Sequence, residues 1–572
     1  MTVGYMLDKF RPSPWRRVLA ALAAAMAAGG AAAAAPRDFA HIVVIYQENH
    51  SFDNLFGLWG KVGGRAVDGL DSAPRQRTLQ ARQDGTPYRC LLQNDVNLAS
   101  PPLAAECLDG AGAAGFGSHF RNAPFRIDDF IGPAATTCPD AGLAPPDGIA
   151  RGSGAPGGCT RDLVHRFYQE QYQIHGGRQD RYVTGSDAAG LAMGYYDTKR
   201  LPIHAYLHAS GAPAYVIAER FFQAAFGGSF LNHQWLIAAH TPVFEGAAND
   251  GGGSDLHTLV DANGMPANTP LYASPLGRAV ADAPLAASCT PPADRPATPP
   301  GAVCGDYAVN TIQPAYPPYA PGTPEARRLP PQTAATIGEA LSLAGIDWAW
   351  YSGGWSNAAG NVDAPGWSNG AGGAAGCTDP NRHATAAWPY CPDRSFQFHH
   401  QPFNYFAAYA PGTAARAAHL RDETEFIAAA REGRLKTVSF VKPLGMDNEH
   451  PGYASEQRGN AHLVELLRAI DAGPQAGRTL VIVAYDEFGG AWDHVPPPGQ
   501  GGTPGPHDEF GPGSRIPVLL ISRRFKRSAV DHESHDTTAI LATIEHRFHL
   551  PALSRRDAAV KDLWGAVQAA TR

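Results

Sequence analysis

Acidic and amide side chains follow two of the most apolar segments of the chain. Glu48 and Asn49 come after HIVVIY, and Asp486 and Glu487 come after TLVIVAY. Carboxylates that pack together raise each other's pKa unless a cation lies between them, and a divalent metal ion bound through oxygen atoms removes that cost. The pattern therefore predicts a metal or cation site at these residues. A single carboxylate after a strand is more often a turn former or a helix cap, so the prediction depends on the two pairs meeting.

A nucleophile is predicted in the segment FGGSFLNHQWLIAAH. Gly227 and Gly228 permit a tight turn, and Ser229 stands at the expected N-cap of a helix. Free N–H groups and the positive end of the helix dipole favour a phosphate there. The alternative is that Ser229 only caps the helix. A serine esterase of the α/β-hydrolase kind is not supported, because the residues around Ser229 do not form the GxSxG motif.

Histidines are the third component of the predicted site. His165 lies in RDLVHRFYQEQYQIHGG, a predicted helix, and His399 and His400 open the segment HHQPFNYF. His450 follows the apolar segment KTVSFV, and His535 begins HDTTAILATIEHRF. Any one of them taken alone is more often a hydrogen-bonded structural residue. That structural interpretation is the default for four other histidines, namely His50, His119, His233 and His494.

The elements that must position these residues follow from short apolar runs. Six of them are predicted to be buried strands of a parallel sheet, at residues 41–46, 212–218, 346–352, 436–441, 479–485 and 516–522. Five helical patterns lie among and after them, at residues 232–240, 333–345, 423–433, 459–473 and 537–550. Strands that alternate with helices indicate an α/β fold. Ligands of such sheets bind beyond the carboxyl ends of the strands, where the predicted acidic residues lie.

The N-terminus is typical of an export signal. Residues 1–35 are predicted to be a signal peptide, because basic residues precede an alanine-rich apolar run that ends in small residues. A membrane-spanning helix is the alternative, but alanine is weakly apolar and no positive charges follow the run, so no stable membrane anchor is expected. Residues 36–572 are predicted to form a single catalytic domain. It carries insertions without helical or strand periodicity near residues 60–160, 245–330 and 355–395.

The eight cysteines all fall in these insertions. They form four pairs of sequence neighbours, Cys90 with Cys107, Cys138 with Cys159, Cys289 with Cys304 and Cys377 with Cys391. Closing a short loop costs little entropy, so local pairing is preferred. Disulfides that staple the insertions indicate an oxidising compartment, periplasmic or extracellular. The formal net charge of −7 provides no basic surface for nucleic acid.

Six motifs occur in a fixed order along the chain. They are VVIYQENHSFDNLFG, GGSFLNHQ, HHQPFNYF, NEHPG, YDEFGGAWDHVPPP and HDTTAILATIEHRF. Together they resemble the bacterial phosphoesterase family, which holds non-haemolytic phospholipases C and a group of acid phosphatases. The resemblance runs from about residue 38 to about residue 550, outside the insertions. The segments YQENHSFDNLFG and DLVHRFYQEQYQIHGGRQDRYV look closer to the acid phosphatases.

The resemblance implies an alkaline-phosphatase-like fold, with a mostly parallel central sheet flanked by helices, and a covalent phosphoenzyme. It implies that Ser229 is the nucleophile and that one divalent metal ion is held by Glu48, Asn49, Ser229, Asp486 and Glu487. It also implies that His165, His400, His450 and Asn49 contact the phosphoryl group. Two positions depart from the family. Asp486-Glu487 stands where some acid phosphatases have two aspartates, and His233 stands where phospholipases often have arginine.

The expected function is that of a secreted acid phosphatase, which hydrolyses small phosphate monoesters through a phosphoserine. Protonated histidines bind a dianion best below about pH 6.5, which fits an acid optimum. The alternative is a phospholipase C that cleaves phosphodiesters such as phosphatidylcholine. It depends on whether Trp348, Trp350, Tyr351, Trp355 and Trp367 form an aromatic cage for a choline headgroup or simply belong to the core. A non-catalytic binding protein with the same fold is disfavoured, because every site position carries a competent side chain.

Overall fold

The computed structural model describes most of the chain. It covers residues 36–82, 84–91, 120–129, 133, 162–186, 189–245, 307–320, 323–368, 396–452 and 454–572. It also covers four short strands, β4 (Cys107–Leu108), β5 (Gly117–Ser118), β10 (Leu259–Val260) and β11 (Val280–Ala281). The predicted signal peptide lies outside the described residues. Each predicted disulfide includes a cysteine whose side chain lies outside them, so these pairings stay predictions.

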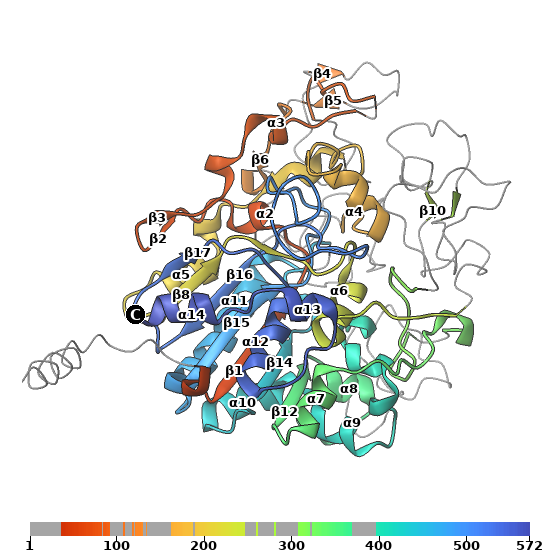
Figure 1. The fold of residues 1–572 in the computed structure, drawn as a ribbon, viewed down its shortest axis with the longest axis vertical. Coiled ribbons are helices and arrows are strands. Elements are labelled where there is room, and N and C mark those ends of the chain that lie inside the picture. Colours follow the sequence, from red (N-terminus) through yellow and green to blue (C-terminus); the bar gives the residue numbers. More distant parts are fainter. Residues whose placement is uncertain are drawn as a thin grey trace, which may run out of the picture.

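An eight-stranded sheet forms the centre of the molecule (Figure 1). Its order is β13 (Leu420–Asp422), β12 (Trp348–Ser352), β14 (Val438–Lys442), β1 (His41–Gln47), β15 (Thr479–Tyr485), β16 (Val518–Ser522), β8 (Ala214–Ala218) and β17 (Ala529–Asp531). All neighbours are parallel except at β16, which runs antiparallel to both β15 and β8. The prediction of an α/β fold with a mostly parallel sheet is confirmed, and all six predicted strands belong to it.

Helices flank this sheet (Figure 1). Five correspond to the predicted patterns, α6 (Ser229–Ala238), α7 (Ile337–Leu343), α10 (Glu423–Glu432), α11 (Glu456–Ala472) and α12 (Thr538–Phe548). The others are α2 (Phe52–Phe56), α3 (Arg75–Thr78), α4 (Phe167–Ile174), α5 (Pro202–Leu207), α8 (Trp355–Ala359), α9 (Ala414–His419), α13 (Arg555–Ala559) and α14 (Trp564–Thr571). Short strands complete the described part, β2 (Lys61–Val62), β3 (Arg65–Ala66), β6 (Phe125–Arg126), β7 (Gly194–Tyr195), β9 (Phe221–Phe222) and β18 (His535–Asp536). None of the helices in the described ranges combines the length and hydropathy needed to cross a bilayer.

The middle of the sheet is fully covered. Every residue of β15 is buried, and so are six of the seven residues of β1, because helices cover both strands. A strand buried on both faces has no polar side to expose, which explains the continuous apolar runs of the sequence. The carboxyl ends of β14, β1 and β15 therefore meet at one edge of the sheet, and the polar residues that follow them are delivered to the same place.

Candidate active site

The loops after β1 and β15 bring their polar residues together. The two strands are parallel neighbours and stay in register through their last residues. Oδ1 of Asp486 accepts hydrogen bonds from the backbone N–H of Asn49 (3.0 Å) and of Glu487 (2.8 Å). Asn49 adopts a positive φ of 55°, which turns the chain back towards the second loop. Glu48 and the other three residues are all buried, so the two predicted pairs do meet.

Ser229 lies against three of these four residues. Its Oγ is 2.9 Å from Glu48 Oε2, 3.3 Å from Asn49 Oδ1 and 3.4 Å from Glu487 Oε1. A hydroxyl carries a single proton, and Glu48 is its nearest acceptor. The five side chains that were predicted to surround one ion are therefore gathered in one place, although they come from three distant segments of the chain.

The turn before Ser229 determines where its hydroxyl points. Helix α6 begins at Ser229 and its N-cap is Gly228. The expectation that Ser229 is the N-cap is therefore wrong, because the extended residue that precedes the helix is the glycine. Gly227 has a φ of +90°, and a Cβ added to it would lie 2.7 Å from the backbone nitrogen of Phe167. A Cβ on Gly228 would lie 3.0 Å from the ring of His165, so the glycine pair allows the approach of this histidine.

The three predicted histidines lie around the same residues. His400 Nε2 is 3.3 Å from Glu48 Oε1, and His165 Nε2 is 3.6 Å from Glu487 Oε1. His450 Nε2 is 3.0 Å from Asn49 Nδ2. The expectation that His165 lies on a helix is wrong. It lies two residues before α4, whose N-cap Arg166 is still extended.

Two further side chains touch Glu48 and were missed as site residues. Lys442, the last residue of β14, forms an ion pair with Glu48 Oε1, and its Nζ donates to the carbonyl of Tyr46 (3.1 Å). His233 lies one turn after Ser229 on α6, and its Nε2 is 3.7 Å from Glu48 Oε1. Its position at i+4 from a predicted nucleophile was the available signal, since residues four apart share a helix face.

Burial and charge act differently on the three acids. Burial opposes the ionisation of Glu48, but the neighbouring His400 and the ammonium of Lys442 outweigh it and hold its pKa well below the usual value. Burial and the neighbouring Glu48 raise the pKa of Asp486, and burial and Asp486 raise that of Glu487. Two acids with raised pKa values beside a serine oxygen are what a divalent cation stabilises in ionised form.

A metal ion would also bind an oxygen atom of this cluster that has no other partner among the described residues. Oδ2 of Asp486 is buried and has no hydrogen-bond partner among the described residues. A buried carboxylate oxygen left without a partner is costly unless a cation binds it. All five side chains present an oxygen, the ligand atom that hard divalent cations prefer. The chemistry of the donor set is thus that of an oxygen-ligated metal site.

Three groups in the described part of the chain could supply both histidine and carboxylate ligands, with ligand atoms within 4.8 Å of one another. They are Glu48 with His233 and His400, Asp162 with His165 and His450, and Asp53 with Asp493 and His494. The first two adjoin Ser229. The third holds the guanidinium of Arg515, which bonds both aspartates at 3.0 Å. A cation already neutralises that group, so His494 belongs to a buried structural network.

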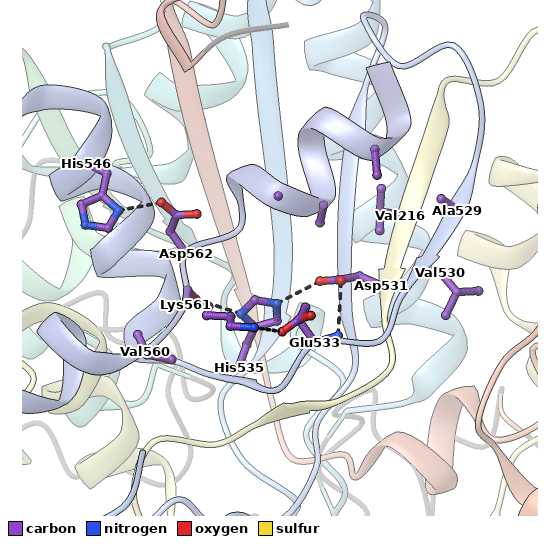
Figure 2. Close-up of a pocket in the computed structure, with 13 residues that line it drawn as sticks. Val216, Ala529, Val530, Asp531, Glu533, His535, His546, Val560, Lys561 and Asp562 are labelled. Atoms are coloured by element: carbon purple, nitrogen blue, oxygen red, sulfur yellow. Dashed lines mark hydrogen bonds and ion pairs between the residues drawn. The ribbon is translucent and has the colours of Figure 1, made fainter. Parts of the chain in front are cut away.

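A separate hollow of about 610 Å³ lies between β8, β17 and the C-terminal helices (Figure 2). His535, which begins one of the six motifs, points into it and bonds Asp531 Oδ2 at 2.9 Å. Lys561 pairs with Glu533, and His546 bonds Asp562. The charged groups along this hollow thus satisfy one another. His535 is a structural histidine, in agreement with the interpretation of such residues taken alone.

The aromatic residues considered for a choline cage belong largely to the core. Trp348, Trp350 and Trp355 are buried, and so is Tyr351. Trp350 stacks on Phe440 of the adjacent strand at 5.7 Å between ring centroids. These four side chains are not available as a cage on the surface.

Comparison with known proteins agrees with this arrangement of nucleophile, acids and histidines. The model of the Phosphoesterase family matches residues 39–551. The chain belongs to the Phosphoesterase family. The predicted resemblance is therefore confirmed over most of the chain. Membership of this family also supports the general activity, that of a hydrolase acting on phosphoric esters.

Relatives of known function lie in the same family. The chain is 34% identical over 163 residues to phospholipase C B of Mycobacterium tuberculosis and 33% identical over 168 residues to phospholipase C A of the same organism. It is 28% identical over 163 residues to non-specific phospholipase C6 of Arabidopsis thaliana. These alignments cover 24%, 26% and 24% of this chain, and 30%, 32% and 31% of the relatives. The chain thus matches about a third of the length of the curated relatives.

Proposed function

We propose that this protein hydrolyses phosphoric esters through a phosphoserine at Ser229. The proposal is carried by one observation, the convergence of the Ser229 hydroxyl with Glu48, Asn49 and Glu487 within 3.4 Å. A divalent ion held by Glu48, Asn49, Ser229, Asp486 and Glu487 would supply positive charge that stabilises the serine alkoxide and the phosphoryl oxygens. An oxygen donor set of this kind suits several divalent metals.

The chain's own groups account for the proton transfers. The hydroxyl of Ser229 donates to Glu48 Oε2, so this carboxylate is placed to take the proton as Oγ attacks phosphorus. The bond from phosphorus to the leaving oxygen breaks, and a histidine protonates the departing alcohol. His400 and His450 are the candidates for this acid, since both adjoin the residues that contact Ser229. Water then attacks phosphorus from the opposite side and gives a proton to the same histidine, the bond from phosphorus to Oγ breaks, and Oγ takes back its proton from Glu48.

We propose a phosphodiester as the preferred substrate, in the manner of a phospholipase C. The named relatives are phospholipases C. The charge of the site supports the same choice. Burial lowers the pKa values of His400 and His450, which disfavours the positive charge that a dianion would require. A phosphodiester carries one negative charge and requires less compensation than the dianion of a phosphomonoester.

The acid phosphatase remains the second candidate. It is favoured by the burial of Trp348, Trp350 and Trp355, which removes the most obvious cage for a quaternary ammonium headgroup. With lowered histidine pKa values, the protonated histidines that bind a dianion are disfavoured as the pH rises towards neutral. A phosphomonoesterase built on this site is therefore expected to lose activity steeply as the pH rises towards neutral.

Steady-state assays distinguish the two substrates. We expect kcat/KM on p-nitrophenylphosphorylcholine to exceed that on p-nitrophenyl phosphate at pH 7, and phosphatidylcholine to yield diacylglycerol. The reverse order at every pH would favour the phosphatase. Ser229→Ala removes the attacking oxygen and should abolish turnover of both substrates, whereas Ser528→Ala, a serine beside β17, should leave both rates unchanged. Full activity of Ser229→Ala on both would exclude the proposed nucleophile.

We also propose that the protein is exported, on the strength of the predicted signal peptide and the paired cysteines of the insertions. N-terminal sequencing of the protein recovered from the periplasm or medium of its host should begin near residue 36. Recovery of the intact chain from the cytoplasm alone would contradict export.

A further inference from the structure

The two oxygens of the Glu48 carboxylate have different surroundings. Oε2 accepts from the Ser229 hydroxyl at 2.9 Å and belongs to the side where the ion of the proposed function would bind. Oε1 faces the opposite group, in which Lys442 forms an ion pair with it and the Nε2 atoms of His400 and His233 lie 3.3 and 3.7 Å away. Glu48 thus separates a serine-facing side from a group of one lysine and two histidines.

The Nε2 atoms of the two histidines lie near Glu48 Oε1 and make no hydrogen bond to any other group within the described ranges. Both atoms are buried. The two rings are parallel, with centroids 5.0 Å apart. Nδ1 of His233 lies 2.7 Å from the carbonyl of Ser229, so it carries the proton and leaves a lone pair on Nε2. A backbone carbonyl that fixes the tautomer in this way is typical of histidines that bind metal.

Two imidazole nitrogens and one carboxylate oxygen are a donor set for a transition metal. Ligand atoms of Glu48, His233 and His400 lie within 4.8 Å of one another, close enough for one ion to reach all three. A set of two histidines and one glutamate binds zinc in known catalytic sites. The set shares Glu48 with the oxygen donors beside Ser229 but uses the other oxygen of that carboxylate, and His233 also adjoins Asp486, with its Nδ1 3.8 Å from Oδ2.

Lys442 keeps a metal ion from binding to this set of ligands. Its side chain is 1% exposed, and its ammonium is held by Glu48 Oε1, by the carbonyl of Tyr46 at 3.1 Å and over the Tyr46 ring at 5.7 Å. A divalent ion bound to the same oxygen would lie within a few ångströms of a fixed positive charge in a buried environment, where repulsion is strong. Together these contacts leave no room for a second cation at Oε1.

We propose that Lys442 is a built-in cation that takes the place of a second metal ion, and that its removal opens a transition-metal site at Glu48, His233 and His400. The lysine is a positioning residue, because it acts on Ser229 only through Glu48. It holds the carboxylate with Oε2 towards the serine. The inference relies on the proposed function only for the assignment of the ion beside Ser229, since the experiment compares ion counts between variant and wild type.

Lys442→Met, whose unbranched side chain is one atom shorter and carries no charge, provides the test. The wild type and the variant are equilibrated with Zn²⁺, dialysed, and analysed for zinc per chain. We expect the variant to retain one ion more than the wild type, and Lys442→Met combined with His400→Ala to return to the wild-type count. Lys436→Met is the matched control, because Lys436 pairs with Asp347 on the surface, and its count should equal that of the wild type. An unchanged count in Lys442→Met would overturn the proposal.

X-ray absorption at the zinc edge tests the same claim through the ligands of the bound ion, and its wild-type arm does not rely on a variant that folds. In the wild type the bound ion should have oxygen ligands and no imidazole scattering, and in Lys442→Met a second environment with two imidazoles should appear. Imidazole scattering in the wild type would mean that the histidine set binds metal in the presence of the lysine, and would overturn the proposal. Neither count nor spectrum depends on turnover, so failure of the proposed reaction would be recognised separately in the assays of Ser229→Ala.

Discussion

Glu170, on α4, supports the turn that carries Ser229. Its carboxylate accepts hydrogen bonds from the backbone N–H of Gly227 (2.5 Å) and Ser514 (2.6 Å) and from Nε2 of Gln223 (2.9 Å). Burial raises its pKa to about 8, although these donors oppose the shift. The folded protein therefore holds a proton on Glu170 over a pH range in which the unfolded chain, with a carboxyl pKa of about 4.3, has lost it.

The sign of the resulting pH dependence follows from linkage. Between about pH 5 and pH 7 the folded state binds one proton more than the unfolded state at this residue, so its contribution to stability falls as the pH rises. One proton corresponds to about 1.4 kcal/mol per pH unit. Over these two units the contribution of Glu170 to the free energy of unfolding should fall by about 3 kcal/mol. Glu170→Gln keeps the shape and does not titrate, so it should lack this decrease.

Urea unfolding at pH 5, 6 and 7 measures the effect. The free energy of unfolding of the wild type, minus that of Glu170→Gln, should decrease by about 1.4 kcal/mol for each pH unit. Other titrating groups are present in both proteins and cancel in the difference. Leu343→Gln is the control, because Leu343 is 90% exposed and neither side chain titrates, and its difference from the wild type should be the same at each pH. Parallel pH profiles for wild type and Glu170→Gln would refute the reasoning.

Three further predictions concern the turn, the buried charges and the acids. Gly227→Ala places a Cβ 2.7 Å from the backbone of Phe167 at a positive φ, so it should lower the free energy of unfolding by about 1–3 kcal/mol and remove most of the turnover. Gly412→Ala is the control, because Gly412 has a similar φ but open space around it, and it should cost less stability and leave kcat unchanged. Equal losses in the two variants would contradict this prediction. Arg515→Met removes the guanidinium from Asp493 and leaves Asp53 with His494 as its ion-pair partner, so it should lower the free energy of urea unfolding by about 3–5 kcal/mol. Arg523→Met, at a surface pair, should change it by less than about 1 kcal/mol. A small loss in Arg515→Met would argue against the structural role of that network. Asp486→Asn removes an anionic ligand, so titration calorimetry should find weaker binding of divalent ions, and unchanged affinity would place the ion elsewhere.

The centre of the fold was predicted well from the sequence. The strands β1 and β15 are buried on both faces, so they consist almost entirely of apolar residues, and such runs are easy to recognise. The same logic predicted that Glu48 and Asp486 meet, since parallel neighbours end at one edge. The edge strands β13 and β17 were missed, because they have three residues each and include charged ones, which follow no strand pattern.

Lys442 was missed for a different reason. It directly follows the strand predicted at residues 436–441, and its role depends on which strand lies beside β14. That neighbour is β1, and the pairing cannot be read from either segment alone. His233 has the same property. Its helix was predicted, but the contact with Glu48 follows from how α6 is placed against the end of β1.

The central claim is that Ser229 becomes covalently phosphorylated during turnover. The most direct measurement mixes enzyme with excess p-nitrophenylphosphorylcholine or p-nitrophenyl phosphate, quenches with acid within one turnover, and maps the modified peptide by mass spectrometry. The account predicts a phosphorylated or phosphorylcholine-bearing peptide that contains Ser229, and no modified peptide in Ser229→Ala. A productive enzyme with no modified serine, or with the modification on another residue, would contradict it.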